Sequence, residues 1–305
     1  MMPKERMPYL FLLTILLSVP FYFMRDEMDT ETIRKNRYWA IKTRNTQTYD
    51  IVFGGDSRTF RGVSPAHFAA GMEGRRVYNY AYWANGFGKD YLEGLESKID
   101  TTSSFQMIIL GVTPHSLTEK TARSPHYHFE MSRARKGVVQ TVFLSWLEEY
   151  FAPYGIAELT EKLTGRSRPH NKRIIYHDDG WVETWWIRPD TMNAAKSYKN
   201  LFEGDPVSDA VIADLMEYVE SWTRRGIYVV GFRPPASYTI RQFEELRGGF
   251  SEPALIDRFR EAGGIWLDIP PEGYRTYDGS HLEHHSAMQF SSDLARMIRE
   301  KVPEL

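Results

Sequence analysis

Short apolar runs alternate with amphipathic stretches along most of the chain. Runs rich in β-branched and aliphatic residues predict five strands, at Tyr49–Phe53, Arg76–Tyr80, Gln106–Gly111, Ile227–Phe232 and Ile265–Asp268. Helical patterns fall between and after them, at about Pro65–Met72, Lys89–Lys98, Asp209–Arg224, Pro253–Ala262 and His284–Lys301. Strands separated by helices indicate parallel β-α-β units. The expected fold is therefore α/β, a three-layer α/β/α sandwich around a mostly parallel five-stranded sheet.

The first segment of the chain has a different pattern, typical of a transmembrane helix. An apolar run extends from Tyr9 to Met24, with Lys4 and Arg6 before it and acidic residues directly after it. Positive charge before such a run keeps the N-terminus in the cytoplasm and places the rest of the chain outside. The sequence therefore predicts an N-terminal anchor at 1–26 in the cell (inner) membrane, with an extracytoplasmic or periplasmic domain.

Two alternatives to an anchor remain open for this run. It is short for a membrane span, which would also suit a cleaved signal peptide. The bulky exit Phe21-Tyr22-Phe23-Met24-Arg25 disfavours cleavage, because signal peptidase sites carry small residues. The run could also form a buried N-terminal helix of a cytosolic protein.

The remaining chain divides into a linker and one large domain with an insertion. Residues 27–48 are polar and basic and predict a juxtamembrane helix or linker, and 49–305 form the predicted catalytic domain. The alternation of strands and helices is interrupted at about 115–205, which holds five of the nine histidines. We expect this insertion to fold over the active edge of the sheet and to contain a helix near Val138–Phe151.

Composition excludes several functional classes. The chain of 305 residues has a net charge of −2, and it contains neither a dense basic tract nor an RNA-binding signature, so nucleic acid is not expected as a partner. It has no cysteine, which excludes disulfides, cysteine nucleophiles and thiolate zinc sites. No metal or redox cofactor is expected.

The first candidate for chemistry is Gly55-Asp56-Ser57, directly after the first predicted strand. A serine at a strand-to-loop turn projects its hydroxyl over the edge of the sheet, and its backbone N–H can face an oxyanion. The tripeptide alone is a weak signal. It is equally compatible with a turn in which Asp56 or Ser57 caps the next segment.

The second candidate is Asp278-Gly279-Ser280-His281, immediately before the last predicted helix. Asp-x-x-His on one short loop lets the carboxylate orient the imidazole of the same loop. His284 and His285 fall in the first turn of that helix, where the dipole disfavours an imidazolium, so we expect them to be surface or packing residues. Asp278, His281 and His284 could also suggest a metal, but no second cluster with ligand spacing supports one.

The order of Ser57, Asp278 and His281 resembles that of the SGNH/GDSL hydrolase superfamily. In that family the serine follows the first strand, and the Asp-x-x-His loop precedes the final helix. The resemblance covers about 49–113 and 207–302 and implies a catalytic triad of these three residues. An N-terminal anchor with an external domain is similar to the alginate acetyltransferase and D-alanyl transfer branch.

The resemblance implies further groups that stabilise the oxyanion, and here the match is weaker. Gly86 is the best candidate for the second block's backbone donor, whereas Asn79 is expected to brace the loop. The third block usually has Gly-x-Asn-Asp, but this chain reads Gly111-Val112-Thr113-Pro114. The Asn is missing, and Thr113 is the candidate substitute through its hydroxyl.

Two further positions are candidates for substrate binding. Arg233 follows the fourth predicted strand and could hold an anionic group of a polymer, or it could pair with a structural carboxylate. Trp181, with Trp185 and Trp186, could stack on sugar rings or pack within the insertion.

These features together predict acyl transfer through an acyl-enzyme on Ser57. The first expectation is a membrane-anchored O-acyltransferase that modifies a cell-surface or exported polysaccharide. Its partners would be an acylated donor, a glycan acceptor and a multi-spanning membrane acyltransferase. A carbohydrate or lipid esterase is the second possibility, and a non-catalytic glycan-binding or assembly protein is the third.

Overall fold

The computed structural model describes residues 7–23, 31–151 and 172–302. The chain divides into two compact units, one formed by Met1–Arg44 with Ser132–His170 and the other by Asn45–Met131 with Asn171–Leu305. We describe each unit by itself. This division differs from the predicted one, because the insertion at 115–205 contributes to both units.

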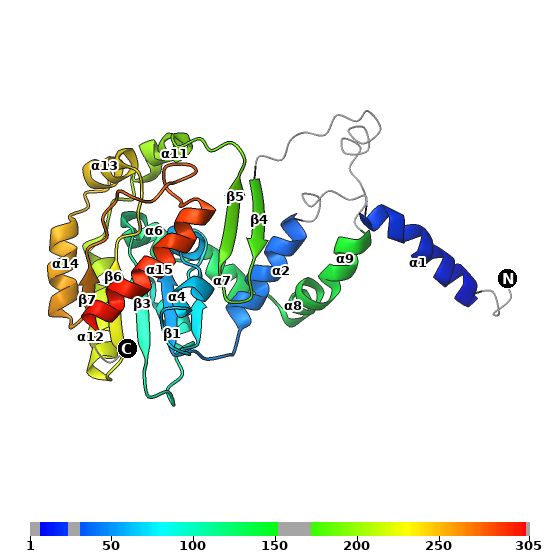
Figure 1. Cartoon of the computed structure of the whole chain (residues 1–305), viewed down its shortest axis with the longest axis horizontal. Coiled ribbons are helices and arrows are strands. Elements are labelled where there is room, and N and C mark those ends of the chain that lie inside the picture. The colour runs from blue at the N-terminus through cyan, green and yellow to red at the C-terminus, as the bar shows by residue number, and fades with distance from the viewer. Residues whose placement is uncertain (1–6, 24–30, 152–171, 303–305) are drawn as a thin grey trace. The chain divides into compact units, whose positions relative to one another are not determined.

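The larger unit is built on a five-stranded, entirely parallel sheet in the order β2-β1-β3-β6-β7 (Figure 1). Its strands are β1 (Ile51–Gly55), β2 (Val77–Asn79), β3 (Met107–Gly111), β6 (Tyr228–Phe232) and β7 (Ile265–Leu267). All five lie where the sequence predicts strands, and the α/β fold class is confirmed. The strand order reverses direction between β1 and β3, the kind of position where ligands bind in such sheets.

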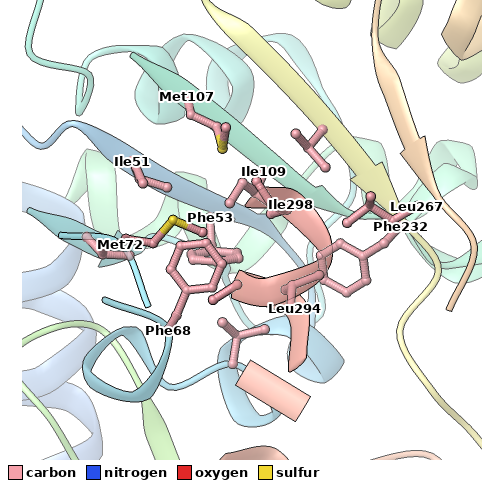
Figure 2. Close-up of a cluster of buried hydrophobic side chains, with 14 of the residues drawn as sticks. Ile51, Phe53, Phe68, Met72, Met107, Ile109, Phe232, Leu267, Leu294 and Ile298 are labelled. Carbon is pink, nitrogen blue, oxygen red and sulfur yellow. The ribbon is translucent and has the colours of Figure 1, made fainter. Parts of the chain in front are cut away.

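Side chains along each strand point alternately to the two faces of the sheet, and each face packs against a different set of helices. Figure 2 shows one face, where strand residues such as Ile51, Phe53 and Ile109 form a core with residues of α4 (Pro65–Ala69) and α15 (His284–Lys301). On the other face, Gly54 lies against Leu95, and Gly231 against Phe259. Those partners belong to α5 (Lys89–Glu96) and α14 (Glu252–Glu261). With α12 (Asp209–Arg224), these helices are the five predicted from the sequence.

The end of β1 leads into a tight turn that places Ser57. Gly55 has φ +141°, and a Cβ there would lie 2.4 Å from Thr59 Oγ1 and 2.7 Å from the Gly111 carbonyl oxygen. Only glycine fits this close approach of the turn to β3. Asp56 then caps α3 (Ser57–Gly62) by accepting a hydrogen bond from the backbone N–H of Arg58. Ser57 therefore becomes the first residue of a helix at the carboxyl edge of the sheet.

The elements that the sequence analysis missed lie around this edge. They are α3, the hairpin of β4 (Lys172–Tyr176) and β5 (Val182–Trp186), α11 (Asn193–Leu201) and α13 (Tyr238–Leu246). After β3, and before the chain enters the smaller unit, it forms η3 (Pro114–Leu117), α6 (Glu119–Ala122) and α7 (Pro125–Ser132). The helices α11 and α13 are one residue longer than the predicted α5 and are amphipathic, so their pattern was an available signal, whereas the shortest elements have too few residues for a clear hydrophobic period.

The smaller unit contains only helices among its described residues. They are α1 (Met7–Phe23), α2 (Glu31–Arg44), α8 (Arg135–Val139), a π-helical turn η4 (Gln140–Leu144) and α9 (Ser145–Phe151). Arg34 and Arg37 of α2 form ion pairs with Glu149 of α9, at 2.7 and 3.0 Å. The sequence predicts one helix near Val138–Phe151. In the structure, η4 separates this stretch into α8 and α9.

The structure does not support the expected membrane anchor. Over the described parts of the chain, no helix is long and apolar enough to cross a bilayer. Residues 1–6 and 24–30, which include the charged flanks of the predicted span, lie outside the described residues.

The geometry of Gly55 gives a test of the turn that carries Ser57. We expect Gly55→Ala to lower the free energy of unfolding by about 1–3 kcal/mol, since the new Cβ collides with Gly111. Gly74 also has a positive φ, +78°, but a Cβ there meets nothing within 4 Å. Gly74→Ala therefore controls for backbone strain alone, and should cost about 1 kcal/mol. Urea unfolding measures both; equal losses would contradict the steric explanation.

Candidate active site

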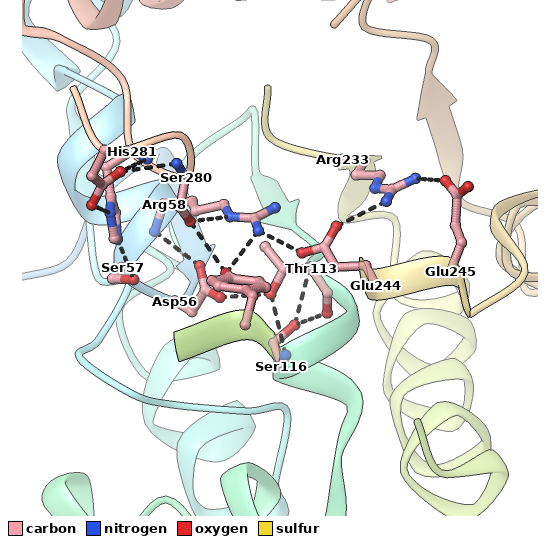
Figure 3. Close-up of polar contacts among 12 residues, drawn as sticks. Asp56, Ser57, Arg58, Thr113, Ser116, Arg233, Glu244, Glu245, Ser280 and His281 are labelled. Atoms are coloured by element: carbon pink, nitrogen blue, oxygen red, sulfur yellow. Dashed lines mark hydrogen bonds and ion pairs between the residues drawn. The ribbon is translucent and has the colours of Figure 1, made fainter. Parts of the chain in front are cut away.

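Ser57, His281 and Asp278 form a continuous chain of hydrogen bonds in the structure, and Figure 3 labels its members Ser57 and His281. Ser57 Oγ lies 2.8 Å from His281 Nε2, and His281 Nδ1 lies 2.8 Å from Asp278 Oδ2. Ser57 begins α3, and the Asp278–His281 loop leads into α15. The structure thus brings together two segments that are 224 residues apart. A hydroxyl, an imidazole and a carboxylate in this order can activate the hydroxyl as a nucleophile.

The loop that carries Asp278 and His281 is held by its own backbone and by its neighbours. Asp278 Oδ1 accepts hydrogen bonds from the backbone N–H groups of Ser280 and His281, at 2.9 and 2.8 Å. Gly279 has φ +93°, and a Cβ there would lie 2.3 Å from the Thr191 carbonyl oxygen. The Asp278 carbonyl accepts from the backbone N–H of Ala194. These contacts leave the imidazole little freedom to turn away from Ser57.

The charges in the loop favour a neutral imidazole beside an ionised carboxylate. Burial opposes ionisation of Asp278, but the hydrogen bonds and charge of His281 and the Ser280 N–H hold the pKa of Asp278 at about 2. Burial lowers the pKa of His281; Asp278 opposes this effect, and Arg61 and Arg58 add to it. At neutral pH, His281 can therefore accept a proton from Ser57.

Thr113 does not contribute its hydroxyl to an oxyanion site. It is fully buried, and its Oγ1 donates a hydrogen bond to Asp56 Oδ2 at 2.6 Å. Its oxygen also accepts from the backbone N–H of Ser116 at 3.2 Å. Thr113 thereby holds Asp56, the residue that caps the helix of Ser57. The hydroxyl expected as an oxyanion donor is therefore used to support the helix that begins at Ser57.

Gly86 is also not placed to be an oxyanion donor. Its backbone N–H already donates to the Thr121 carbonyl oxygen at 2.9 Å. A Cβ at Gly86 would lie 2.7 Å from the Ser116 carbonyl oxygen, so glycine is needed here for packing. In the same loop, Ala84 has φ +46°, a left-handed conformation that is uncommon for alanine. The loop is attached beside the nucleophile, because the Tyr82 N–H donates to the Gly55 carbonyl oxygen.

The side chain of Asn79 is hydrogen-bonded to three backbone groups of the neighbouring loops. It is fully buried, and its Nδ2 donates to the carbonyl oxygens of Thr59 and Val63, at 3.0 and 2.8 Å. Its Oδ1 accepts from the Ala81 N–H at 3.1 Å. One side chain thus joins the end of β2 to both ends of the segment after Ser57.

Comparison with known proteins does not identify a family for this chain. No protein-family model matches it, and no curated protein matches it. One solved structure, provisionally described as a platelet activating factor from Streptococcus pneumonia, shares 11% sequence identity with it. The match covers 93% of this chain and 99% of the other, with a TM-score of 0.36. A likeness this low carries no functional argument, so the conclusion depends on the geometry around Ser57.

The two substrate-binding candidates, Arg233 and Trp181, are both engaged inside the protein. Arg233 is buried, and it pairs with Glu244, Glu245 and Glu252 at 2.8, 3.0 and 2.6 Å. This is the structural pairing that the sequence left open. Trp181 is 4% exposed, packs in the core and donates from Nε1 to the Arg61 carbonyl oxygen. Its ring is therefore not open for stacking on a sugar.

The other tryptophans and histidines of this region pack against each other. Trp185 is 38% exposed and stacks on His284 at 3.7 Å between ring centroids, and His284 Nδ1 lies 2.9 Å from Glu183. Trp186 stacks on Tyr277, which in turn stacks on His281. Within the described ranges, no group of three or more His, Asp or Glu side chains is arranged to hold a metal ion.

Sequence reasoning missed a buried polar network next to the triad. Arg58 contacts Ser280, in the loop of Asp278 and His281, and Glu244 (Figure 3). It also donates a hydrogen bond to Tyr198. Two signals for this network were available in the sequence. Arg58 directly follows the serine, and Ser280 lies inside the Asp-x-x-His motif. Glu244 and Tyr198 lie on α13 and α11, which the sequence pattern did not predict.

Proposed function

We propose that this protein is a serine acyl-transfer enzyme of the SGNH/GDSL type. In this proposal Ser57 is the nucleophile, His281 is the general base and acid, and Asp278 orients the imidazole. The single observation that carries the proposal is the hydrogen-bond chain from Ser57 Oγ through His281 to Asp278. The lowered pKa of His281 supports the role of a base at neutral pH.

The proposed reaction has two steps. His281 Nε2 takes the proton of Ser57 Oγ as the oxygen attacks an ester carbonyl, and the tetrahedral intermediate then expels the alcohol. His281 gives its proton to that alcohol, which leaves an acyl ester on Ser57. In the second step His281 removes a proton from water or from an acceptor hydroxyl, which attacks the acyl group, and His281 then returns this proton to Ser57 Oγ as the serine leaves. No cofactor takes part in this scheme.

The oxyanion would be stabilised by backbone N–H groups. The N–H of Ser57 begins a helix, where such groups have no intrahelical acceptor. We propose a second donor in the loop of Ala84, because a strained backbone close to a nucleophile is typical of functional sites. The Asn of the third block is absent, and Thr113 is bound to Asp56. Loss of one such donor costs about 3–4 kcal/mol in comparable sites, which disfavours a fast esterase.

For the acceptor, we propose a hydroxyl of a cell-surface or exported polysaccharide. This choice depends on the absent oxyanion Asn and on the family resemblance. The corresponding partners would be an acylated donor and a multi-spanning membrane acyltransferase. Export and membrane attachment remain predictions from the Tyr9–Met24 run. A carbohydrate or lipid esterase is the second candidate, since the same acyl-enzyme can react with water.

The assignment of Ser57 can be tested with a fluorophosphonate probe. We expect the probe to label the wild-type protein once, at Ser57, because only an activated serine attacks phosphorus rapidly. Ser57→Ala should abolish labelling. Ser64→Ala is a matched control, since Ser64 Oγ also contacts a histidine nitrogen, His67 Nδ1, at 2.9 Å. Mass spectrometry of the intact and digested protein reads the result. Labelling that persists in folded Ser57→Ala protein would exclude this nucleophile.

The charge environment of His281 predicts the pH dependence of the reaction. The base must be neutral, so activity is lost as pH falls through the pKa of His281. Because that pKa is lowered by burial, the acid limb of kcat/KM should lie below about pH 6.5, the ordinary value for histidine. Asp278→Asn removes a group that raises this pKa, so the limb should move further down, and kcat should fall by roughly 10⁴-fold. Hydrolysis of p-nitrophenyl acetate measures both. A wild-type acid limb above pH 7 would contradict the assigned environment.

Transfer and hydrolysis differ in where the acyl group goes. With p-nitrophenyl acetate as donor, we expect added neutral or acidic oligosaccharides to accelerate nitrophenol release and to become acetylated on oxygen. This follows because the second step would be limited by the acceptor. Mass spectrometry of the glycan and a free-acetate assay separate the two fates. Release of acetate from an acetylated glycan, with no transfer to any added glycan, would favour the esterase instead.

A further inference from the structure

Arg58 is a buried charge located between the two halves of the triad. It follows Ser57 directly, is 3% exposed, and belongs to the helix whose first residue is the nucleophile. Its Nε donates to Ser280 Oγ at 3.0 Å, and its Nη2 donates to Glu244 Oε1 at 2.5 Å and to Tyr198 OH at 2.7 Å. One planar guanidinium thus contacts three separate segments of the chain.

Ser280 connects this guanidinium to the triad loop. It lies between Asp278 and His281, and its backbone N–H donates to Asp278 Oδ1. Its hydroxyl also lies 3.2 Å from Tyr198 OH. The contact between Arg58 and Ser280 spans 222 residues of sequence and runs beside the contact between Ser57 and His281. The nucleophile's helix and the base's loop are therefore joined twice.

Glu244 fixes the other end of the guanidinium. It is fully buried and bridges two arginines, with Oε1 on Arg58 and Oε2 on Arg233 (Figure 3). Arg233 is held in turn by Glu245 and Glu252. Burial lowers the pKa of Arg58, but the charges of Glu244, Tyr198 and Asp56, with the hydrogen bond to Glu244, together more than offset this, so that pKa is raised and Arg58 stays charged.

Stability alone does not account for this arrangement. A buried ion pair gives little net stability, because the desolvation of both charges offsets their attraction. Arg58 Nη1 is also buried without a hydrogen-bond partner among the described residues, which adds a cost of about 1–3 kcal/mol. The value of the pair is geometric, since charge and planarity define the position of the loop more sharply than apolar packing would.

We infer that Arg58 is a positioning residue, which holds the Asp278–His281 loop at hydrogen-bonding distance from Ser57 through Ser280, with Glu244 as its anchor. The inference rests on the proposed function, because it assigns Arg58 to the acylation step. A shift of about 1 Å between a nucleophile and its base can cost roughly 10²-fold in rate. Arg58 would act through Ser280 and His281 and need not touch the substrate.

Three variants test this inference in the full-length protein. Arg58→Lys keeps the charge but lacks the fork that reaches Ser280 and Glu244 together. We expect kcat for p-nitrophenyl acetate to fall by roughly 10²-fold with KM nearly unchanged. Ser280→Ala removes one hydrogen bond and should lower kcat by about 10-fold while the protein stays folded. Arg58→Met should lower kcat as Arg58→Lys does, and it also removes a charge that disfavours protonation of His281.

The pH profile separates positioning from a merely structural role. Arg58→Met should move the acid limb of kcat/KM to higher pH, whereas Arg58→Lys and Ser280→Ala should leave the limb in place. Arg233→Met is the matched control, because it removes a buried guanidinium from the same network without contact with the loop. Thermal unfolding should show that Arg233→Met loses about as much stability as Arg58→Met. The acid limb of its kcat/KM profile should stay in place.

The outcomes distinguish this inference from the proposed function. Wild-type protein that is folded but not labelled by the fluorophosphonate overturns the proposed function, whatever the variants do. If wild type is labelled, but folded Arg58→Lys and Ser280→Ala keep its kcat and labelling rate, the positioning role is wrong. If Arg58→Met does not fold, Ser280→Ala alone decides, because its substitution removes only a hydroxyl.

Discussion

The hydrogen bond between Ser57 Oγ and His281 Nε2 is the contact on which the rest of the site depends, and its 2.8 Å length is set by the whole sheet. Ser57 is placed by the end of β1, and His281 by the loop that leads from β7 into α15. A parallel sheet brings all strand ends of one kind to a single edge, so distant segments meet there. The register between β1 and β3 is tight enough that Gly55 cannot carry a Cβ beside Gly111. Packing in the core thus defines a distance in the site.

Most of the sheet could be predicted from the sequence, because burial between two helical layers produces continuous apolar strands. All five strands of the sheet lie within two residues of their expected bounds, and the long helix Asp209–Arg224 agrees at both ends. The hairpin of β4 and β5 could not be predicted in this way. Its strand β4 is only partly buried and carries Lys172 and Arg173, so it shows no clear two-residue period.

The site was predictable only as far as local motifs define it. Asp278 and His281 lie on one loop, so their contact follows from spacing, and Ser57 follows from its place after a strand. The other candidates depend on which partners a group already has. The N–H of Gly86 is bonded to Thr121, the hydroxyl of Thr113 to Asp56, and Arg233 to three carboxylates. Sequence shows the donors of a chain, but only the fold shows which of them are already used.

The polar groups around Ser57, Asp278 and His281 already donate hydrogen bonds to acceptors inside the protein. This affects the fate of the proposed acyl-enzyme. Thr113, Asn79 and Arg58 direct their donors inward, to Asp56, to backbone carbonyls and to Ser280. These donors are therefore already used in hydrogen bonds within the protein. With few oxyanion donors, the tetrahedral intermediate of the second step is weakly stabilised, so that step gains most from an acceptor that brings binding energy of its own. Water brings none, whereas a polymer hydroxyl does, and for this reason the proposed function places transfer before hydrolysis at Ser57.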